Sequence, residues 1–338
     1  MVAASNRGMI PPPAAPEFLA AHGWGDAEIL PLAGDASFRR YFRVVAPDRQ
    51  AVLMDAPPEH EDIRPFLKIA RHLVAQGHSA PRDLAVDLDR GLLLLEDFGD
   101  RLVGPELARD PLLEETVYTD ALSILDQLHR AAPPEGVAPY DAAVLHREVD
   151  LLIEWYAPAI GSAVDAAGFH AAWDAVFPAI LAGQSAHPVL VLRDYHADNL
   201  MLLDRPGTAR LGLLDFQDAL VGHAAYDLVS LLQDARRDVS PALEEAMLHR
   251  WSALTGCDAE AFRAQYEILG AQRNTKIVGI FARLWQRDGK PRYLDYLPRV
   301  WGYLERNLAH PALAPVASWF DANIPPELRG PAWKQSRA

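Results

Sequence analysis

Three side chains with the chemistry of a metal-dependent transfer reaction stand in the middle of the chain: Asp194, Asn199 and Asp215. Asp194 comes shortly after the apolar segment 189–192, Asn199 follows five residues later, and Asp215 directly follows the apolar segment 211–214. A carboxylate can accept the proton of a hydroxyl group, and amide and carboxylate oxygens are ligands that Mg²⁺ prefers. Together they form the base and metal-ligand set that phosphoryl transfer requires.

The elements that must position these residues are short strands joined by polar turns. Segments 189–192, 200–203 and 211–214 are apolar and bounded by turn-forming residues, which is typical of buried strands. Asp and Asn are also common turn formers, so each of the three alone would more often be structural. Their joint spacing at strand ends favours a catalytic and metal-binding role over a structural one. We interpret His196 and Asp198, in the same turn, as capping and solvent-facing residues.

The spacing resembles the catalytic loop H-R-D-x-x-x-x-N of the protein-kinase-like superfamily. Leu192-Arg193-Asp194 with Asn199 matches this loop, with Leu192 in place of the usual His. The segment Asp215-Phe216-Gln217-Asp218-Ala219, followed by Gly222 and Asp227, is similar to the aminoglycoside and choline phosphotransferase branch. The resemblance implies that Asp194 is the catalytic base and that Asn199 and Asp215 hold Mg²⁺. It also implies that Asp227 braces the catalytic loop, residues 193–199.

The same resemblance implies an α+β, protein-kinase-like fold of two lobes, with a small antiparallel sheet in the N-lobe and a larger, mostly helical C-lobe. The hydrophobic pattern fits, since it predicts strands over 38–45, 50–55 and 91–95, a helix over 61–76 and mostly helices after residue 113. We place a flexible arm at 1–16, the N-lobe at 17–98 with a hinge at 95–98, the C-lobe at 99–329 and a tail at 330–338. The C-lobe then contains the catalytic loop 193–199 and a metal-binding turn, residues 215–218.

An N-lobe of this kind would bind ATP. Residues 34–37 form a small-residue turn whose backbone amides can cover phosphates, although a plain hairpin would show the same pattern. Met54 stands where the kinase pattern has its phosphate-binding lysine. Because side chains alternate along a strand, we expect Val44 over the adenine and Arg40, on the same face, toward the phosphates; an exposed surface arginine is the alternative. The predicted ATP-binding residues are Ser37, Arg40, Val44, Met54, Glu96 and Phe98.

Further segments resemble the bacterial N-acetylmuramate/N-acetylglucosamine anomeric kinases, cytoplasmic enzymes of peptidoglycan recycling that phosphorylate the C1 hydroxyl with ATP. These segments are 34–41, 54–58, Glu148 with 155–156, and 273–284, so the resemblance covers both lobes. Arg273 and Lys276, three residues apart on one helix face, are candidates for binding the lactyl carboxylate of N-acetylmuramate. Glu148 and Trp155 are candidates for the sugar hydroxyls and the sugar face. Ordinary helix-surface or core roles are the alternative for all four residues.

The composition limits the class of partner. The formal net charge of −14 argues against nucleic acid, and the single cysteine, Cys257, fits a reducing compartment. No apolar run approaches the roughly 20 residues of a membrane span. We therefore expect an amino sugar and ATP as partners, with Mg²⁺ as cofactor, no nucleic acid, no membrane and a cytoplasmic location. The sequence does not decide the oligomeric state, and a monomer is the preferred interpretation.

Two alternatives stay open at this stage. The chain could be an aminoglycoside or other small-molecule phosphotransferase, although Arg273 and Lys276 would oppose a polycationic acceptor. It could also be an inactive nucleotide- or sugar-binding module, because Met54 replaces the expected lysine. The presence of Asp194 and both predicted metal ligands argues against this second alternative.

Overall fold

The computed structural model describes residues 9–34 and 38–330. The chain forms two compact units, which we call the sheet unit and the helical unit. The sheet unit contains the described residues up to Glu106 together with Asp198–Asp218. The helical unit contains Leu107–Ala197 and the described residues from Ala219 onward. An α+β fold of this composition was predicted, and it is confirmed by the antiparallel sheet and the helical part described below.

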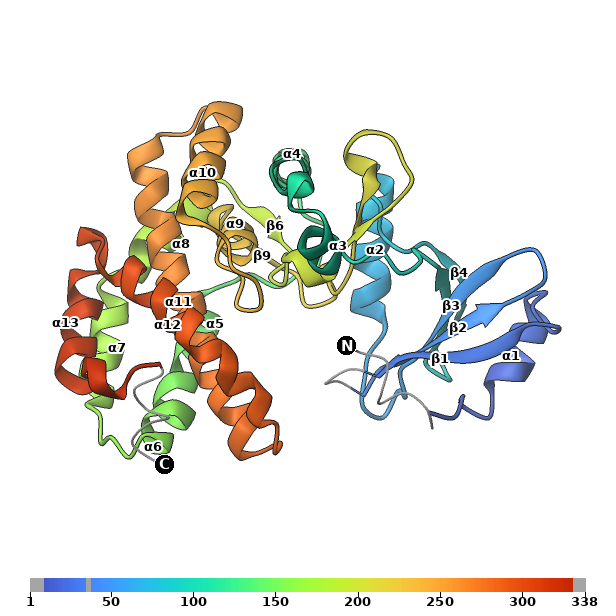
Figure 1. The fold of residues 1–338 in the computed structure, drawn as a ribbon, viewed down its shortest axis with the longest axis horizontal. Coiled ribbons are helices and arrows are strands. Elements are labelled where there is room, and N and C mark those ends of the chain that lie inside the picture. Colours follow the sequence, from blue (N-terminus) through green and yellow to red (C-terminus); the bar gives the residue numbers. More distant parts are fainter. Residues whose placement is uncertain (1–8, 35–37, 331–338) are drawn as a thin grey trace. The chain divides into compact units, whose positions relative to one another are not determined.

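The sheet unit is built on one five-stranded antiparallel sheet in the order β1-β2-β3-β5-β4 (Figure 1). Its strands are β1 (Glu28–Gly34), β2 (Arg40–Val45), β3 (Gln50–Asp55), β4 (Asp83–Asp87) and β5 (Leu92–Glu96). Most residues of β2, β3 and β5 are aromatic, β-branched or leucine, which suits them to a pleated and buried surface.

The two faces of this sheet are covered differently. Helix α1 (Ala15–Ala21) packs on one face, where Phe18 and Leu19 join a buried cluster with Phe42, Val44 and Leu53. Helix α2 (Arg64–Ala75) lies on the opposite face (Figure 1). An apolar stripe of α2 is buried, consisting of Phe66, Leu67, Ile69, Ala70 and Leu73. The period-2 alternation of each strand therefore divides its side chains between the α1 face and the α2 face.

A hairpin from the middle of the chain completes the sheet unit. Strands β7 (Leu200–Leu202) and β8 (Leu211–Leu213) pair antiparallel, and the Leu202 amide donates a 2.7 Å hydrogen bond to the carbonyl of Arg101. The ring of Phe216, just beyond β8, stacks on Phe66 of α2 with centroids 5.2 Å apart. This packing fixes the turn that begins at Asp215 within the sheet unit.

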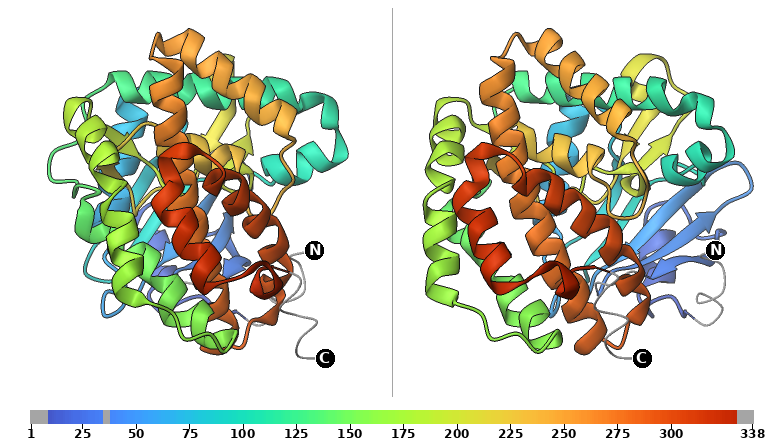
Figure 2. Two further views of the ribbon diagram at one scale, coloured as in Figure 1. Left: turned by 90° about the vertical axis from the view of Figure 1, so that its left-hand side faces the viewer. Right: turned by 60° about the vertical axis from the view of Figure 1, so that its left-hand side comes forward.

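The helical unit is organised around the long helix α11 (Ala259–Gln286), whose N-cap Asp258 accepts a 2.9 Å hydrogen bond from the Ala261 amide. Helices α5, α9 and α12 pack directly on α11, and Figure 2 shows α12 beside it. The other helices are α3 (Val103–Arg109), in which the boundary between units falls, α4 (Glu114–Arg130), α5 (Ala142–Leu151), α6 (Ala157–Ala159), α7 (Ala166–Asp174), α8 (Phe177–Ala186), α9 (Ala225–Leu232), α10 (Pro241–Thr255), α12 (Leu297–Leu308) and α13 (Ala314–Asn323).

Two features of the helical unit were not predicted. Strand β6 (Val189–Val191) pairs antiparallel with a short strand β9 (Leu220–Gly222). Helix α5 continues into one π-helical turn, η2 (Leu152–Tyr156), which packs on α11. Within the described part of the chain, no helix has both the length and the apolar character needed to cross a membrane.

Candidate active site

A cavity of about 410 Å³ opens on the α2 face of the sheet unit. Val52 and Leu95 of the sheet give it apolar walls, the predicted hinge contributes Glu96 and Phe98, and Asn199 and Asp215 line it from the β7–β8 hairpin. The remaining lining residues are Leu32, Tyr41, Phe66, Pro81, Asp97, Gly99, Met201, Leu214 and Gln217. An apolar cleft with a few polar groups at one end suits a flat ring that carries a charged tail.

Close packing holds the hinge against the hairpin. A Cβ added to Gly212 of β8 would lie 2.7 Å from the Phe98 ring, so glycine is needed where the ring approaches the strand. The Glu96 carboxylate accepts hydrogen bonds from Arg205 at 2.6 Å and from Arg82 at 3.1 Å. Both predicted hinge residues thus have their side chains fixed within the sheet unit.

Asn199 and Asp215 lie side by side. Asn199 Nδ2 is 3.4 Å from Asp215 Oδ2, and Gln217 Nε2 donates a 2.8 Å hydrogen bond to Asp215 Oδ1. Amide and carboxylate oxygens at one end of a cleft fit Mg²⁺, which takes a few protein oxygens and completes its shell with water and substrate phosphates. Among the described residues, no group of three or more His, Cys, Asp and Glu side chains could hold a metal.

The structure differs from the sequence expectation for β2. Val44 is fully buried in the cluster beneath α1, so it does not reach the cavity. Arg40, on the same face, pairs with Asp55, with Nε 2.7 Å from the carboxylate. The alternation of side chains along β2 was predicted correctly. The face that carries Arg40 and Val44, however, packs toward α1 and not toward the cavity. Ser37 lies outside the described residues.

The opposite face of β2 meets the cavity. Tyr41 is opposite Met54 of β3 in the register, and Met54 is fully buried. Arg39 precedes the strand on the Tyr41 face, and its Nη2 atom is 3.7 Å from Asp215 Oδ1. Arg39 was not among the residues predicted to lie near the cavity. The apolar pair Phe42 and Val44 could have indicated it, because these residues pack against α1 and so leave the other face of β2 toward the cavity.

Asp194 lies in the helical unit on the turn after β6. The preceding residue, Arg193, and Asp215 have φ values of 71° and 58°, and they are the two non-glycine residues with positive φ in the described part of the chain. Left-handed backbone at a bulky residue persists only where surrounding contacts enforce it. At Arg193 those contacts come from Asp227 of α9, whose carboxylate accepts 2.7 Å and 2.8 Å hydrogen bonds from the amides of Leu192 and Arg193.

The electrostatics keep Asp194 ionised. Burial alone would raise the pKa of its carboxyl, but the positive charges of Lys276 and Arg273 outweigh burial and lower the pKa. A carboxylate that stays deprotonated at neutral pH can accept a proton. Asp227 is fully buried, and burial raises its pKa to about 7 despite the two backbone hydrogen bonds.

Glu148 is the centre of a buried polar cluster. Its carboxylate accepts hydrogen bonds from Lys276 Nζ at 2.8 Å and Gln272 Nε2 at 3.0 Å, and also from Tyr140 and Arg193. Four donors match the lone-pair sites of a carboxylate, and Glu148 thereby holds the cations Lys276 and Arg193. Its binding to sugar hydroxyls stays a prediction. Arg193 and Tyr140 had not been predicted to act here, and because Glu148, Arg193 and Lys276 are far apart in sequence, no local signal shows the cluster.

The other predicted acceptor residues lie on α11 and on the π-helical turn. Arg273 is 5% exposed and donates a 3.0 Å hydrogen bond to Ser230 of α9, so it lies beneath the surface. Lys276 also contacts the Tyr226 hydroxyl at 3.3 Å. Trp155 is half-buried on η2. His196, expected to face solvent, is buried beside Arg236, and burial lowers its pKa to about 3.

The comparison with known families decides the class. The sequence profile described as "Phosphotransferase enzyme family" matches residues 28–266. The chain belongs to this family. The chain is 40% identical to the N-acetylmuramate/N-acetylglucosamine kinase of Caulobacter vibrioides, over 92% of this chain and 96% of that one. It is 41% identical to the protein of the same name from Pseudomonas aeruginosa, over 88% of this chain and 90% of that one.

Solved structures confirm the fold of this family member. A choline/ethanolamine kinase family protein from Mesorhizobium loti superposes with a TM-score of 0.56 at 15% identity, over 91% of this chain and 98% of that one. The similarity covers both units, so the protein-kinase-like architecture predicted from the catalytic loop is confirmed.

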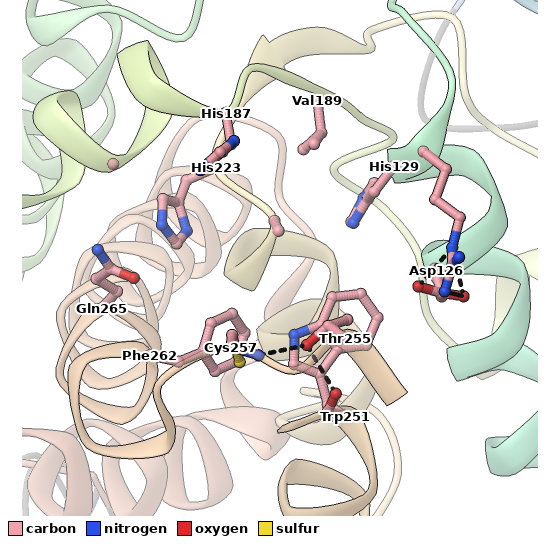
Figure 3. Close-up of a pocket in the computed structure, with 13 residues that line it drawn as sticks. Asp126, His129, His187, Val189, His223, Trp251, Thr255, Cys257, Phe262 and Gln265 are labelled. Carbon is pink, nitrogen blue, oxygen red and sulfur yellow. Dashed lines mark hydrogen bonds and ion pairs between the residues drawn. The ribbon is translucent and has the colours of Figure 1, made fainter. Parts of the chain in front are cut away.

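A second cavity of about 590 Å³ lies in the helical unit of this phosphotransferase (Figure 3). None of the predicted site residues lines it. His129, which the figure shows near Trp251, packs against that indole edge to face, with ring centroids 5.7 Å apart. Burial lowers the pKa of His129 to about 3, so its ring is neutral at pH 7. A packing role explains this histidine.

Proposed function

We propose that this phosphotransferase uses ATP to phosphorylate the anomeric C1 hydroxyl of N-acetylmuramate and N-acetylglucosamine in the cytoplasm. The observation that carries the proposal is the likeness, over most of the chain, to two kinases named for these sugars. The ionised Asp194 beside Lys276 and Arg273 supports it, because a hydroxyl acceptor needs a base and an anionic sugar needs cations.

The reaction follows from the roles of the chain's own residues. Asp194 accepts the C1 hydroxyl proton as the C1 oxygen forms its bond to the γ-phosphorus, and the bond from that phosphorus to the β,γ-bridging oxygen breaks, so that ADP leaves. Asp227 fixes the turn that carries Asp194. Asn199 and Asp215 would hold Mg²⁺, which supplies charge neutralisation to the phosphates when bound.

The cluster around Glu148 supports an anionic acceptor. Arg193 and Lys276 bring two positive charges to the two carboxylates of Glu148 and the ionised Asp194, and Arg273 brings a third, so one positive charge is in excess. Burial would lower the pKa of Lys276, but the neighbouring Tyr226 and Glu148 raise it overall, so the ammonium stays charged. We infer that the surplus charge attracts the lactyl carboxylate of N-acetylmuramate, with Arg273 adding to the field from beneath.

The test is ADP release from Mg·ATP with N-acetylmuramate, N-acetylglucosamine, choline and kanamycin in parallel, with ³¹P NMR of any product. A sugar-1-phosphate from the first two acceptors is the expected result. Faster turnover of choline or kanamycin than of either sugar would contradict the acceptor and retain the phosphotransferase chemistry. Nucleotide binding without turnover of any acceptor would favour an inactive binding module.

A further inference from the structure

Strand β3 of the sheet unit lacks the lysine that would be expected to bind the phosphates of ATP. The triphosphate of ATP is strongly anionic, and phosphoryl transfer relies on protein cations as well as on metal to hold it. On β3 the residue at the expected position is Met54, which is uncharged and fully buried. Another cation in the same cavity must therefore meet the phosphates.

The strand register points to Arg39. Tyr41 of β2 is the pairing partner of Met54, and Tyr41 lines the cavity. Because side chains alternate along an extended chain, Arg39, two residues before Tyr41, lies on the Tyr41 face. Position 39, just before β2, thus presents a cation to the same face that carries Met54 on the neighbouring strand.

Arg39 does not itself line the cavity, but its acidic surroundings include Asp215, which does. Its Nη2 atom is 3.7 Å from Asp215 Oδ1, and its Nε atom is 4.0 Å from Glu61 Oε1. The residue is 9% exposed. An arginine guanidinium stays protonated in proteins, so Arg39 is a permanent positive charge.

Other arginines of the sheet unit occupy different places. Arg40 pairs with Asp55 on the α1 side of the sheet. Arg43 shares the Tyr41 face but pairs with Asp97 at 2.7 Å, at the hinge end of the strand. Of these three arginines, Arg39 is the one beside Asp215.

We infer that Arg39 binds the phosphate oxygens of a nucleoside di- or triphosphate and replaces the missing β3 lysine. The inference rests on the proposed function, in which Asp215 holds Mg²⁺ at the phosphates. A guanidinium can grip phosphate with two parallel hydrogen bonds, which an ammonium cannot do. Without nucleotide, Arg39 neutralises Asp215; with nucleotide, the phosphates become its partners.

The experiment measures binding rather than turnover. Isothermal titration with ATP, ADP and adenosine, each with Mg²⁺, compares the wild-type chain with Arg39→Met and Arg39→Lys. The control is Arg90→Met, which likewise removes one positive charge. Arg90 pairs with Glu17 of α1 and with Asp87. We expect Arg39→Met to weaken ATP and ADP binding about tenfold or more and to leave adenosine binding unchanged. Arg39→Lys should weaken both less, and Arg90→Met should bind all three ligands like wild type.

Other results of the titrations would contradict the role of Arg39. Equal weakening of adenosine and ATP in Arg39→Met would show a structural role, and unchanged ATP binding would remove Arg39 from the phosphates. If thermal unfolding shows that Arg39→Met does not fold, the same comparison with Arg39→Lys decides. Wild-type protein that binds no nucleotide at all would contradict the proposed function itself.

Discussion

The carboxylate of Asp227 accepts a 2.8 Å hydrogen bond from the backbone amide of Arg193, a residue held at a φ of 71°. The other carboxylate oxygen accepts from Leu192. In Asp227→Asn one of the two oxygens becomes an NH₂ group, which cannot accept from an amide. We expect a loss of about 1–3 kcal/mol in unfolding free energy and a lower kcat with unchanged ATP binding. Urea unfolding and steady-state kinetics measure both; wild-type values for both would contradict the brace.

The base itself gives a second prediction. Asp194→Asn keeps the size of the side chain but removes its proton affinity, so kcat should fall by a factor of about 10² to 10⁴. ATP affinity should stay the same, because the residues lining the nucleotide cavity all come from the sheet unit. Single-turnover rates and ATP titration separate the two effects. A variant with near-wild-type kcat would exclude Asp194 as the base.

Asp215→Ala should abolish the part of the ATP affinity that depends on Mg²⁺. Asp204→Ala is the matched control, since Asp204 is an exposed carboxylate in the turn of the same hairpin. Titrating ATP with and without Mg²⁺ gives the metal-dependent gain for each protein. We expect this gain to vanish only in Asp215→Ala, and a gain that survives would place the metal elsewhere.

The Glu148 cluster predicts a pH-dependent stability. Burial would raise the pKa of Glu148, but Lys276 and Arg193 lower it from 4.5 to about 2. A lowered folded-state pKa gives stability that is fully present above the unfolded-state value and is lost as pH falls toward the folded-state value. This contribution is about 3 kcal/mol at pH 7. The difference in unfolding free energy between wild type and Glu148→Gln should therefore shrink between pH 5 and pH 3; a constant difference would contradict the assignment.

Gly279 offers a test of how η2 packs on α11. An added Cβ would lie 2.3 Å from the carbonyl carbon and oxygen of Leu151, where α5 passes into its π-helical turn. Gly279→Ala must push the two helices apart, and we expect a loss of about 2–4 kcal/mol in unfolding free energy. The control is Gly302→Ala on α12, where an added Cβ meets nothing within 4 Å. This control should gain about 0.5–1 kcal/mol.

The sequence predicted most of the architecture because its signals are local. The apolar strands bounded by turns and the amphipathic α2 are all present in the structure. Strand β9 was missed because three residues are too few to show a period. Its pairing with β6 helps place α9, and hence Asp227, near the turn after β6.

The substrate residues were harder to predict because their roles depend on partners far away in the chain. Alternation along β2 separates Arg39 from Arg40, but only the packing of α1 on Phe42 and Val44 decides which face is open. Glu148 has the residue type of a sugar ligand, yet Lys276, Arg193 and Gln272 occupy its oxygens. No spacing rule brings positions 148 and 276 together.

The nucleotide-binding half of this protein is discontinuous in the chain. Its proposed metal ligands lie on Asp198–Asp218, which is separated from the rest of the sheet unit by the first part of the helical unit. A fragment that ends at Glu106 would keep the hinge and lose both Asn199 and Asp215. A genetic exchange at a single crossover point therefore cannot transplant the proposed ATP-binding unit without carrying part of the helical unit with it.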